Sequence, residues 1–244
     1  FLKLNSGMNR LGFTPDAYRL AYHRLYAQGH HVQHMTHFAN ADCIDREPSV
    51  GAQMECFTKT IEGLKGETSL ANSAAILWHR NALGDWVRPG IMLHGISPTG
   101  MYQDIEHAHL KTVMSLSSKI ISIQELQAGD AVGYGARYVA KQAMRVGVIA
   151  CGYADGYPRH AKDGTPVWVY GPQDKTQGAI CPIAGQVSMD MLTIDLSHAP
   201  WARVGTSVEL WGKNLPVDNV ANHAQTIGYE LVCAIAPRVP VEII

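Results

Sequence analysis

An arginine stands inside an apolar stretch in the first half of the chain, where burial of a charged side chain would cost free energy. Residues 86–95 read Trp-Val-Arg-Pro-Gly-Ile-Met-Leu-His-Gly, so Arg88 directly precedes a Pro-Gly pair. An arginine that points inward must be paired. Glycine lets the backbone approach a ligand, so Gly90 and Ile91 can offer main-chain N–H groups to an anion. We interpret Arg88 as directed at a cofactor; the alternative is a strand-end arginine that faces solvent.

A tyrosine between two glycines is the second feature that could do chemistry. The segment Gly133-Tyr134-Gly135 lies in the second half of the chain. Flanking glycines let a backbone present one side chain in an exposed, unusual geometry. A tyrosine can be a general acid or base where positive charge nearby lowers its pKa. The alternative is a hairpin turn with a tyrosine in an interface.

The elements that position these residues alternate between strand and helix over the first hundred residues. We expect four strands, at residues 1–4, 32–38, 69–72 and 86–93. Thr14 and Ser49 are expected to cap helices, and a short helix should begin at Ser73. Strands separated by helices pair in parallel through right-handed crossovers. Four such units make about half of a (β/α)8 barrel, in which chemistry occurs at the C-terminal ends of the strands.

Four polar residues lie at or just after the ends of the expected strands: Arg10, His37, Ser73 and Arg88. Their shared position favours a single site at one end of the half barrel. For His37 alone, the alternative is a core or loop histidine with satisfied hydrogen bonds. For Ser73 the alternative is a simple helix cap, although a capping serine is also well placed to receive a phosphate.

The remainder of the chain has the pattern of a β-rich domain. From about residue 111, short apolar runs are separated by Gly, Asp-Gly and Gly-Pro turns, and only residues 217–224 suggest a short helix. We therefore expect two domains, residues 1–105 as the second half of a (β/α)8 barrel and residues 106–244 as a C-terminal β domain. The fold class is α/β plus all-β.

Composition excludes several kinds of partner. The 244 residues carry a formal net charge of −1, so no basic field points to nucleic acid or an anionic membrane. No apolar run approaches the roughly 20 residues needed to span a bilayer. The five scattered cysteines contain no Cys-x-x-Cys pair, which favours reduced cytosolic thiols over disulfides or a metal site.

Several motifs in chain order resemble those of alanine racemases, pyridoxal 5′-phosphate enzymes of fold type III. They are Lys3-Leu-Asn-Ser-Gly-Met-Asn-Arg10-Leu-Gly, Thr36-His37-Phe-Ala, Ala71-Asn-Ser73-Ala-Ala, Arg88-Pro-Gly90-Ile91, Gly133-Tyr134-Gly135, Gly152-Tyr153-Ala-Asp-Gly, Ser188-Met189-Asp-Met and Tyr229-Glu. The resemblance covers essentially the whole chain, and the bacterial catabolic type is the most similar. It implies a barrel plus a β domain, a cytoplasmic homodimer with shared active sites, and interconversion of L- and D-alanine.

The resemblance assigns catalytic roles to three residues. Tyr134 resembles the second catalytic base, which works in the partner subunit's site and touches the substrate. Two bases on opposite faces of Cα are what racemisation needs. Arg88 resembles the arginine that faces the pyridine nitrogen, where a permanent proton limits electron withdrawal and suppresses transamination. His37 resembles the histidine that links Arg88 to the catalytic tyrosine.

The resemblance also implies a set of binding residues. Cofactor contacts are expected from His37, Ser73, Arg88, Gly90, Ile91 and Tyr229. Anchors for the substrate carboxylate are expected at Arg10 and the main chain of Met189. Lys3 matches a position that is carbamylated in some relatives. Tyr153 and Arg159 resemble entrance-channel residues, and Gln186 stands where many relatives have arginine.

One family motif does not occur in the chain. The family's first half carries the lysine that forms a Schiff base with the cofactor, and no matching motif is found here. The chain begins Phe1-Leu2-Lys3-Leu4, which suggests a fragment. Two alternatives therefore stay open: an inactive fragment or non-catalytic half of a split assembly, and a racemase for other amino acids. Half a barrel alone exposes strand edges and apolar surface, so we expect it to be unstable or to associate.

Overall fold

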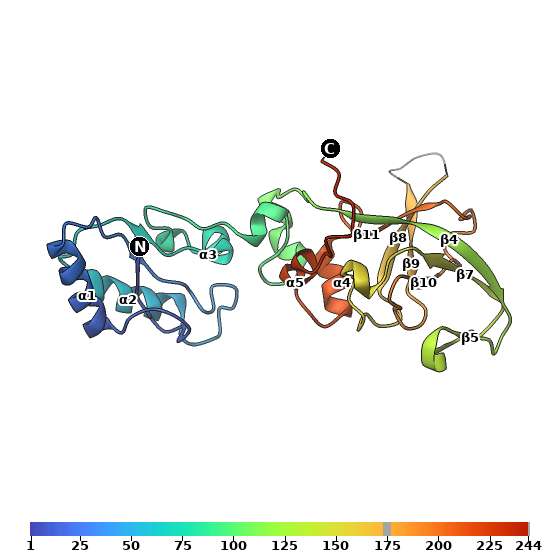
Figure 1. Ribbon diagram of the computed structural model, residues 1–244, viewed down its shortest axis with the longest axis horizontal. Helices are drawn as coiled ribbons and strands as arrows, with labels where there is room; N and C mark the ends of the chain where they lie inside the picture. The colour runs from blue at the N-terminus through green and yellow to red at the C-terminus, as the bar shows by residue number, and fades with distance from the viewer. Residues whose placement is uncertain (173–176, 244) are drawn as a thin grey trace. The chain divides into compact units, whose positions relative to one another are not determined.

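The computed structural model describes residues 1–172 and 177–243 (Figure 1). By its internal contacts the chain divides into two units, Phe1–Leu93 and His94–Ile244. The expected domain boundary, between residues 105 and 106, falls within the 3-10 helix η3 (Tyr102–Ala108) of the second unit and stays a prediction. Among the described residues no helix is long and apolar enough to cross a membrane.

The first unit is built on a small parallel sheet. Its strands β1 (Leu2–Lys3), β2 (His34–Met35) and β3 (Thr68–Ser69) pair in the order β1-β2-β3, and both pairings are parallel. Three helices follow the strands in turn: α1 (Pro15–Ala27), α2 (Val50–Ile61) and α3 (Ser73–Trp78). Alternation of strand and helix, with parallel pairing, is confirmed; the strands are shorter than the sequence suggested.

The fourth expected strand, residues 86–93, does not form. Only one bridge continues the sheet, a parallel pairing of Trp86 with Ser69. Residues Ile91–His94 instead form the 3-10 helix η2. Proline has no N–H to give to a ladder, so Pro89 ends the pairing directly after Arg88. The apolar run of this segment indicated burial, but the Pro-Gly pair decided the local conformation.

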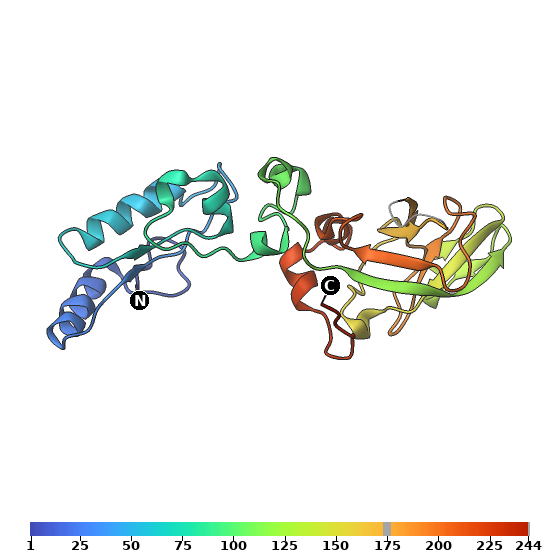
Figure 2. The same ribbon diagram turned by 90° about the horizontal axis from the view of Figure 1, so that it is seen from above.

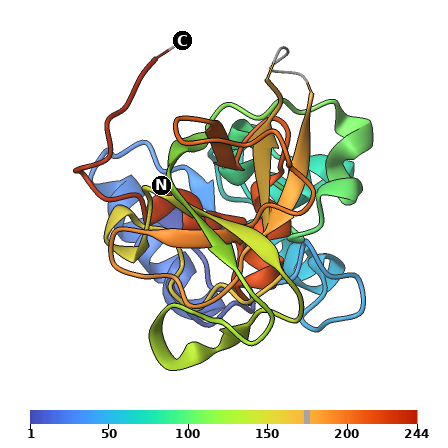
Figure 3. The same ribbon diagram turned by 90° about the vertical axis from the view of Figure 1, so that its right-hand side faces the viewer.

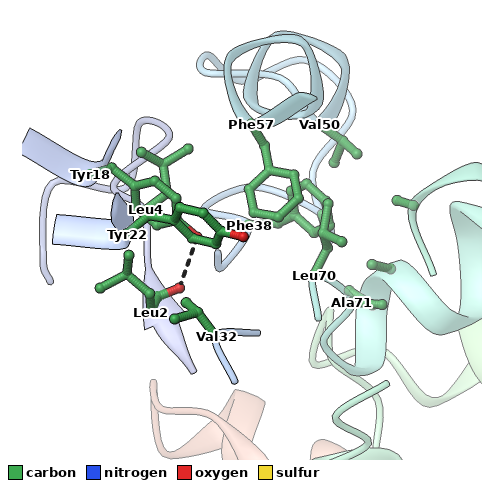
Figure 4. Packing of buried hydrophobic residues seen from close by; sticks show 14 residues of the cluster. Leu2, Leu4, Tyr18, Tyr22, Val32, Phe38, Val50, Phe57, Leu70 and Ala71 are labelled. Carbon is green, nitrogen blue, oxygen red and sulfur yellow. Dashed lines mark hydrogen bonds between the residues drawn. The ribbon is translucent and has the colours of Figure 1, made fainter. Parts of the chain in front are cut away.

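The core of this unit lies between the sheet and its helices (Figure 4). Helix α1 buries Tyr18 and Tyr22, whereas Leu20 and Tyr26 are 75% and 49% exposed. The buried phenols are satisfied: Tyr18 Oη lies 2.7 Å from His34 Nδ1. At the start of α2, Ser49 accepts a hydrogen bond from the Ala52 N–H, as expected of a cap. The Thr14 side chain makes no capping bond.

The second unit is dominated by one antiparallel sheet (Figures 2 and 3). Six strands pair in the order β10-β7-β4-β11-β8-β9, from β10 (Leu192–Asp195), β7 (Met144–Ile149), β4 (Leu116–Leu126), β11 (Ser207–Trp211), β8 (Pro166–Tyr170) and β9 (Gly178–Pro182). An antiparallel bridge between Ile183 and Ile194 joins the segment after β9 to β10. The two edges of the sheet therefore meet, and its strands enclose a common interior. The expected β-rich domain is confirmed.

Two smaller features of this unit carry candidate site residues. A hairpin of β5 (Ala131–Val132) and β6 (Tyr138–Val139) holds the 3-10 turn η4 (Tyr134–Ala136) and projects from the main sheet (Figure 1). The 3-10 turn η5 (Tyr153–Asp155) follows β7.

Helices α4 (Val217–His223) and α5 (Gly228–Cys233) pack against each other, and α4 lies where the sequence predicted a helix. All five cysteines are free.

A buried carboxylate in α4 makes a pH-dependent contribution to stability. Asp218 is 1% exposed; its Oδ2 accepts the Ser97 N–H at 3.2 Å, and its Oδ1 has no partner among the described residues. Burial raises the pKa of Asp218 to about 6. Between the ordinary value near 3.8 and this value, the folded protein binds a proton that the unfolded chain does not. Stability therefore falls as the pH rises through this window.

We expect Asp218→Asn to stabilise the second unit at pH 7. The change removes the charge that burial disfavours, so the free energy of unfolding should rise by about 1–2 kcal/mol at pH 7 and change little near pH 4. Denaturant titrations at both pH values measure this. Glu106→Gln, at an exposed carboxylate of the same unit, is the control. An equal change in the free energy of unfolding at both pH values would contradict the proposed dependence of stability on the ionisation of Asp218.

Candidate active site

Arg88 lies at the end of the parallel sheet of the first unit and is held by neutral acceptors. Its Nη1 donates to Ser69 Oγ at 2.5 Å, and its Nη2 lies 2.7 Å from Thr36 O, 3.1 Å from Leu70 O and 3.1 Å from His37 Nδ1. No carboxylate pairs with Arg88 among the described residues. The Arg88 side chain is half-buried and hydrogen-bonded, and all its partners are uncharged, while its direction towards a cofactor stays a prediction.

His37 is a neutral acceptor for Arg88. Burial, together with the positive charges of Arg88, Arg10 and Lys3, lowers the pKa of His37 to about 4. At neutral pH the ring is therefore uncharged, and its Nδ1, which faces Arg88 at 3.1 Å, accepts while Nε2 carries the proton. This arrangement leaves an N–H on the far side of the ring from Arg88. The histidine is half-buried and lies two residues after the end of β2.

The same end of the half barrel concentrates positive charge. The pKa of Lys3 is lowered by burial and then by the charges of Arg10 and Arg88. Among the described residues, none of these three cations makes an ion pair. Arg10 is exposed in the loop between β1 and α1. Cations gathered without acidic partners create a field that attracts an anion.

Three of the residues that the resemblance names as cofactor contacts, Ser73, Gly90 and Ile91, lie close together. Ser73 Oγ accepts the Gly90 N–H at 2.9 Å and lies 3.4 Å from the Met92 nitrogen. A Cβ built on Gly90 meets nothing closer than Ser73 Oγ, at 3.8 Å. The Ile91 N–H makes no hydrogen bond with any described residue. The hydroxyl proton of Ser73, the free N–H and the open space beside Gly90 fit an anionic oxygen.

Tyr134 occupies a strained and exposed turn of the second unit. It is 77% exposed, and the residues around it, Gly133, Gly135 and Ala136, have φ of 66°, 71° and 48°. Alanine in this left-handed region is uncommon and costs free energy, and such strain collects at functional sites. The phenol is exposed, which agrees with the expectation from its flanking glycines.

An arginine that sequence reasoning missed fastens this turn. Arg137 Nη1 donates to Gln186 Oε1 at 2.9 Å, and Nη2 donates to Gly185 O at 2.8 Å and to Asp163 Oδ1 at 3.2 Å. These bonds tie the Tyr134 turn to the loop that leads to Met189. The signal was present, since Arg137 follows the Gly-Tyr-Gly turn directly, but nothing in the sequence named its partners.

The Met189 loop is fixed by a second missed cluster. The Met189 carbonyl accepts the Ala154 N–H at 2.9 Å, whereas the Met189 N–H has no partner among the described residues. Arg238 lies 2.8 Å from Asp155 Oδ1 and 2.6 Å from Asp190 Oδ1, so it holds this loop against η5. The free Met189 N–H suits the expected contact to a carboxylate. The 83 residues between Arg238 and Asp155 explain why the sequence did not reveal the pair.

The structure thus groups the predicted residues by unit. The first unit brings together Arg88 with His37, and Ser73 with Gly90 and Ile91. The second unit holds Tyr134, Met189 and Tyr229, which is 39% exposed in α5. Because Arg88 and Tyr134 belong to different units, their convergence on one pocket stays a prediction.

Family models match most of the chain. The alanine racemase N-terminal domain matches residues 1–98, and the alanine racemase C-terminal domain matches residues 113–243. Alanine racemase from Burkholderia mallei (strain SAVP1) is 54% identical over 242 residues, which are 98% of this chain and 65% of that protein. The protein of the same name from Ralstonia nicotianae is 52% identical over 248 residues, covering 99% of this chain and 64% of the relative.

Solved structures agree with these matches. The biosynthetic alanine racemase from Pseudomonas aeruginosa has a TM-score of 0.89 at 45% identity, over 98% of this chain and 65% of the other. The enzyme from Bartonella henselae, solved with covalently bound pyridoxal phosphate, has a TM-score of 0.82 at 26% identity, over 98% and 64%. The chain therefore spans just under two thirds of the length of these relatives. With both family models matched in order, the chain belongs to the alanine racemase family and holds the second half of a (β/α)8 barrel followed by the C-terminal β domain.

Proposed function

We propose that the protein containing this chain interconverts L- and D-alanine with pyridoxal 5′-phosphate. The observation that carries the proposal is the Arg88 guanidinium, held at the end of the half barrel by neutral groups in a field of unpaired cations. A cation without a carboxylate partner keeps its charge available to a ligand. Family membership, with relatives named alanine racemase at 52–54% identity, gives the ligand its chemical class.

The residues present fit this cofactor. Ser73 and the Ile91 N–H supply donors for a phosphate beside the open space at Gly90, and Tyr229 is the expected further contact. Arg88 supplies a donor for the pyridine nitrogen. When bound, the cofactor withdraws electrons from the substrate's Cα and so makes its hydrogen acidic.

Arg88 limits how far that withdrawal goes. A guanidinium keeps its protons at any physiological pH, so it donates a hydrogen bond to the pyridine nitrogen without protonating it. His37 cannot protonate that nitrogen through Arg88 either, because its ring stays neutral above a pKa of about 4. By leaving the pyridine nitrogen unprotonated, Arg88 would favour racemisation over the competing transamination.

Tyr134 is the proposed proton carrier on one face of Cα. Racemisation needs a proton-handling group on each face, and the resemblance implies a lysine outside this chain for the other. An exposed phenol on a strained turn is positioned to reach a neighbouring molecule rather than its own interior. We therefore propose a cytoplasmic homodimer in which each Tyr134 serves the partner's site.

The substrate carboxylate has two proposed anchors. Arg10 supplies an exposed, unpaired guanidinium, and the Met189 N–H is free because only the carbonyl of that residue is used within the protein. Both anchors recognise the carboxylate, which every amino acid has. Preference for alanine over larger amino acids would then come from pocket width, and a panel of D-amino acids would distinguish a racemase of broader range.

We expect Tyr134→Phe in the full-length protein to remove proton transfer on one face. The phenyl ring keeps the shape but has no proton to exchange, so kcat should fall about 10²- to 10⁴-fold. Incorporation of solvent deuterium at Cα, followed separately for L- and D-alanine, measures proton transfer on each face of Cα. Tyr26→Phe, at a tyrosine of α1 that is 49% exposed, is the matched control. Near-wild-type rates in both directions would remove Tyr134 from the mechanism.

We expect Arg88→Lys to lower racemisation and raise transamination. Lysine keeps the charge but has no planar fork to reach Ser69, Thr36 and His37 together. Racemisation should fall about 100-fold, as expected of a misplaced catalytic group, while pyruvate formed from alanine increases. Coupled assays for both products follow the two reactions on one sample. Arg145→Lys, at a partly exposed arginine of the β domain, is the control. Unchanged partition between the two products would contradict the role of Arg88.

A further inference from the structure

A glutamine lies in the apolar face of α2, where its polarity is unexpected. The buried residues of this helix are Val50, Gln53, Phe57 and Thr60, which repeat at helical spacing. Gln53 is completely buried. A buried amide costs about 1–3 kcal/mol unless it is hydrogen-bonded, so an apolar residue would satisfy packing more simply. The position therefore calls for an explanation beyond the core.

Every polar atom of the Gln53 side chain is engaged. Oε1 accepts the Ala39 N–H at 2.8 Å, and Nε2 lies 3.1 Å from His37 O and 3.2 Å from Ser6 Oγ. These partners fix the orientation of the amide, since the main-chain N–H needs the oxygen and the carbonyl needs the NH₂ group. The partners belong to two different loops, the one after β1 and the one after β2. Gln53 thus joins the two loops through hydrogen bonds to both.

Two paths lead from Gln53 to Arg88. The first runs through His37, whose carbonyl accepts from Gln53 and whose Nδ1 faces Arg88. The second runs through Ser6, whose Oγ lies 2.6 Å from Thr36 Oγ1, while Thr36 O accepts from Arg88. Both paths consist of buried or half-buried groups with their hydrogen bonds made. A displacement of the Gln53 amide would therefore reach two acceptors of the guanidinium at once.

We propose that Gln53 is a positioning residue of the active site, which holds His37 and Thr36 where both accept the Arg88 guanidinium. The proposal rests on the proposed function, in which Arg88 faces the cofactor. Gln53 itself touches neither substrate nor cofactor by this account. It acts by keeping two loops in register, which a glutamine can do because it donates and accepts at once.

The test uses the full-length protein with Gln53→Met and Gln53→Glu. Methionine keeps the length but makes none of the three bonds; glutamate can still accept the Ala39 N–H, but in its ionised form it has no proton for His37 O. The matched control is Thr60→Val, on the same helix and 4% exposed, whose hydroxyl bonds only to Cys56 O within α2. We expect both Gln53 variants to lose about 10- to 100-fold in kcat with a smaller change in KM, whereas Thr60→Val keeps both.

A second readout needs no activity. The His37 ring is titrated by NMR in the cofactor-free protein, where its pKa is about 4. Arg88, Arg10 and Lys3 are the charged groups that act on it. In both Gln53 variants the pKa should rise towards its ordinary value, because the ring leaves Arg88 and gains water. Absence of racemase activity in the wild-type protein would contradict the proposed function. The His37 titration would still test whether Gln53 positions His37, because it does not depend on activity.

The unaltered protein provides a third readout if either variant fails to fold. The Ala39 N–H should exchange with solvent at least about tenfold more slowly than the Asn40 N–H, which makes no hydrogen bond with any described residue. Equal exchange of the two amides would overturn the proposal. So would folded Gln53 variants whose kcat and His37 pKa match those of Thr60→Val.

Discussion

The site depends on one constraint: a guanidinium must be half-buried without a carboxylate partner that would neutralise its charge. Arg88 meets the constraint by donating to a hydroxyl, two carbonyls and a neutral imidazole. A carboxylate would have added a Coulomb attraction to the same donors, but it would have required the desolvation of a second ion and would have cancelled the charge. Neutral acceptors are weaker, so several are needed, and each must be held in place. Much of the first unit around Arg88 serves that requirement.

The two units hold their site residues by different means. In the first, the groups that accept hydrogen bonds from Arg88 are uncharged, and Gln53, Ser6 and Thr36 form one hydrogen-bonded set. In the second, arginines fasten the loops: Arg137 holds the Tyr134 turn and Arg238 holds the Met189 loop through two aspartates. Exposed ion pairs contribute little to stability. Their value here lies in geometry, since each joins segments that are distant in sequence.

The sequence predicted the parts of the fold that follow from local pattern. Alternation of strand and helix, parallel pairing, the β-rich second half and helix α4 all come from periodicity and turn residues, and all are present. The fourth strand failed because an apolar run shows burial without showing which backbone conformation is buried. On α1 the buried face carries Tyr18 and Tyr22, whose hydroxyls find their partners in His34 and Lys65, which no local pattern names.

The candidate site was predictable where chemistry marks a residue in its own short segment. Arg88, Tyr134, Ser73 and His37 each stand out as a charge among apolar residues, a tyrosine between glycines, or a polar residue after a strand. Gln53, Arg137 and Arg238 carry no such mark, because their roles depend on partners that lie far along the chain, at separations of 14, 49 and 83 residues. A motif records which groups can react, whereas the groups that hold them in place are defined by distances that only the folded chain contains. Replacing such a holding group should therefore alter geometry first and chemistry second, which makes the pKa of His37 a more direct measure of the site's integrity than the rate of the reaction.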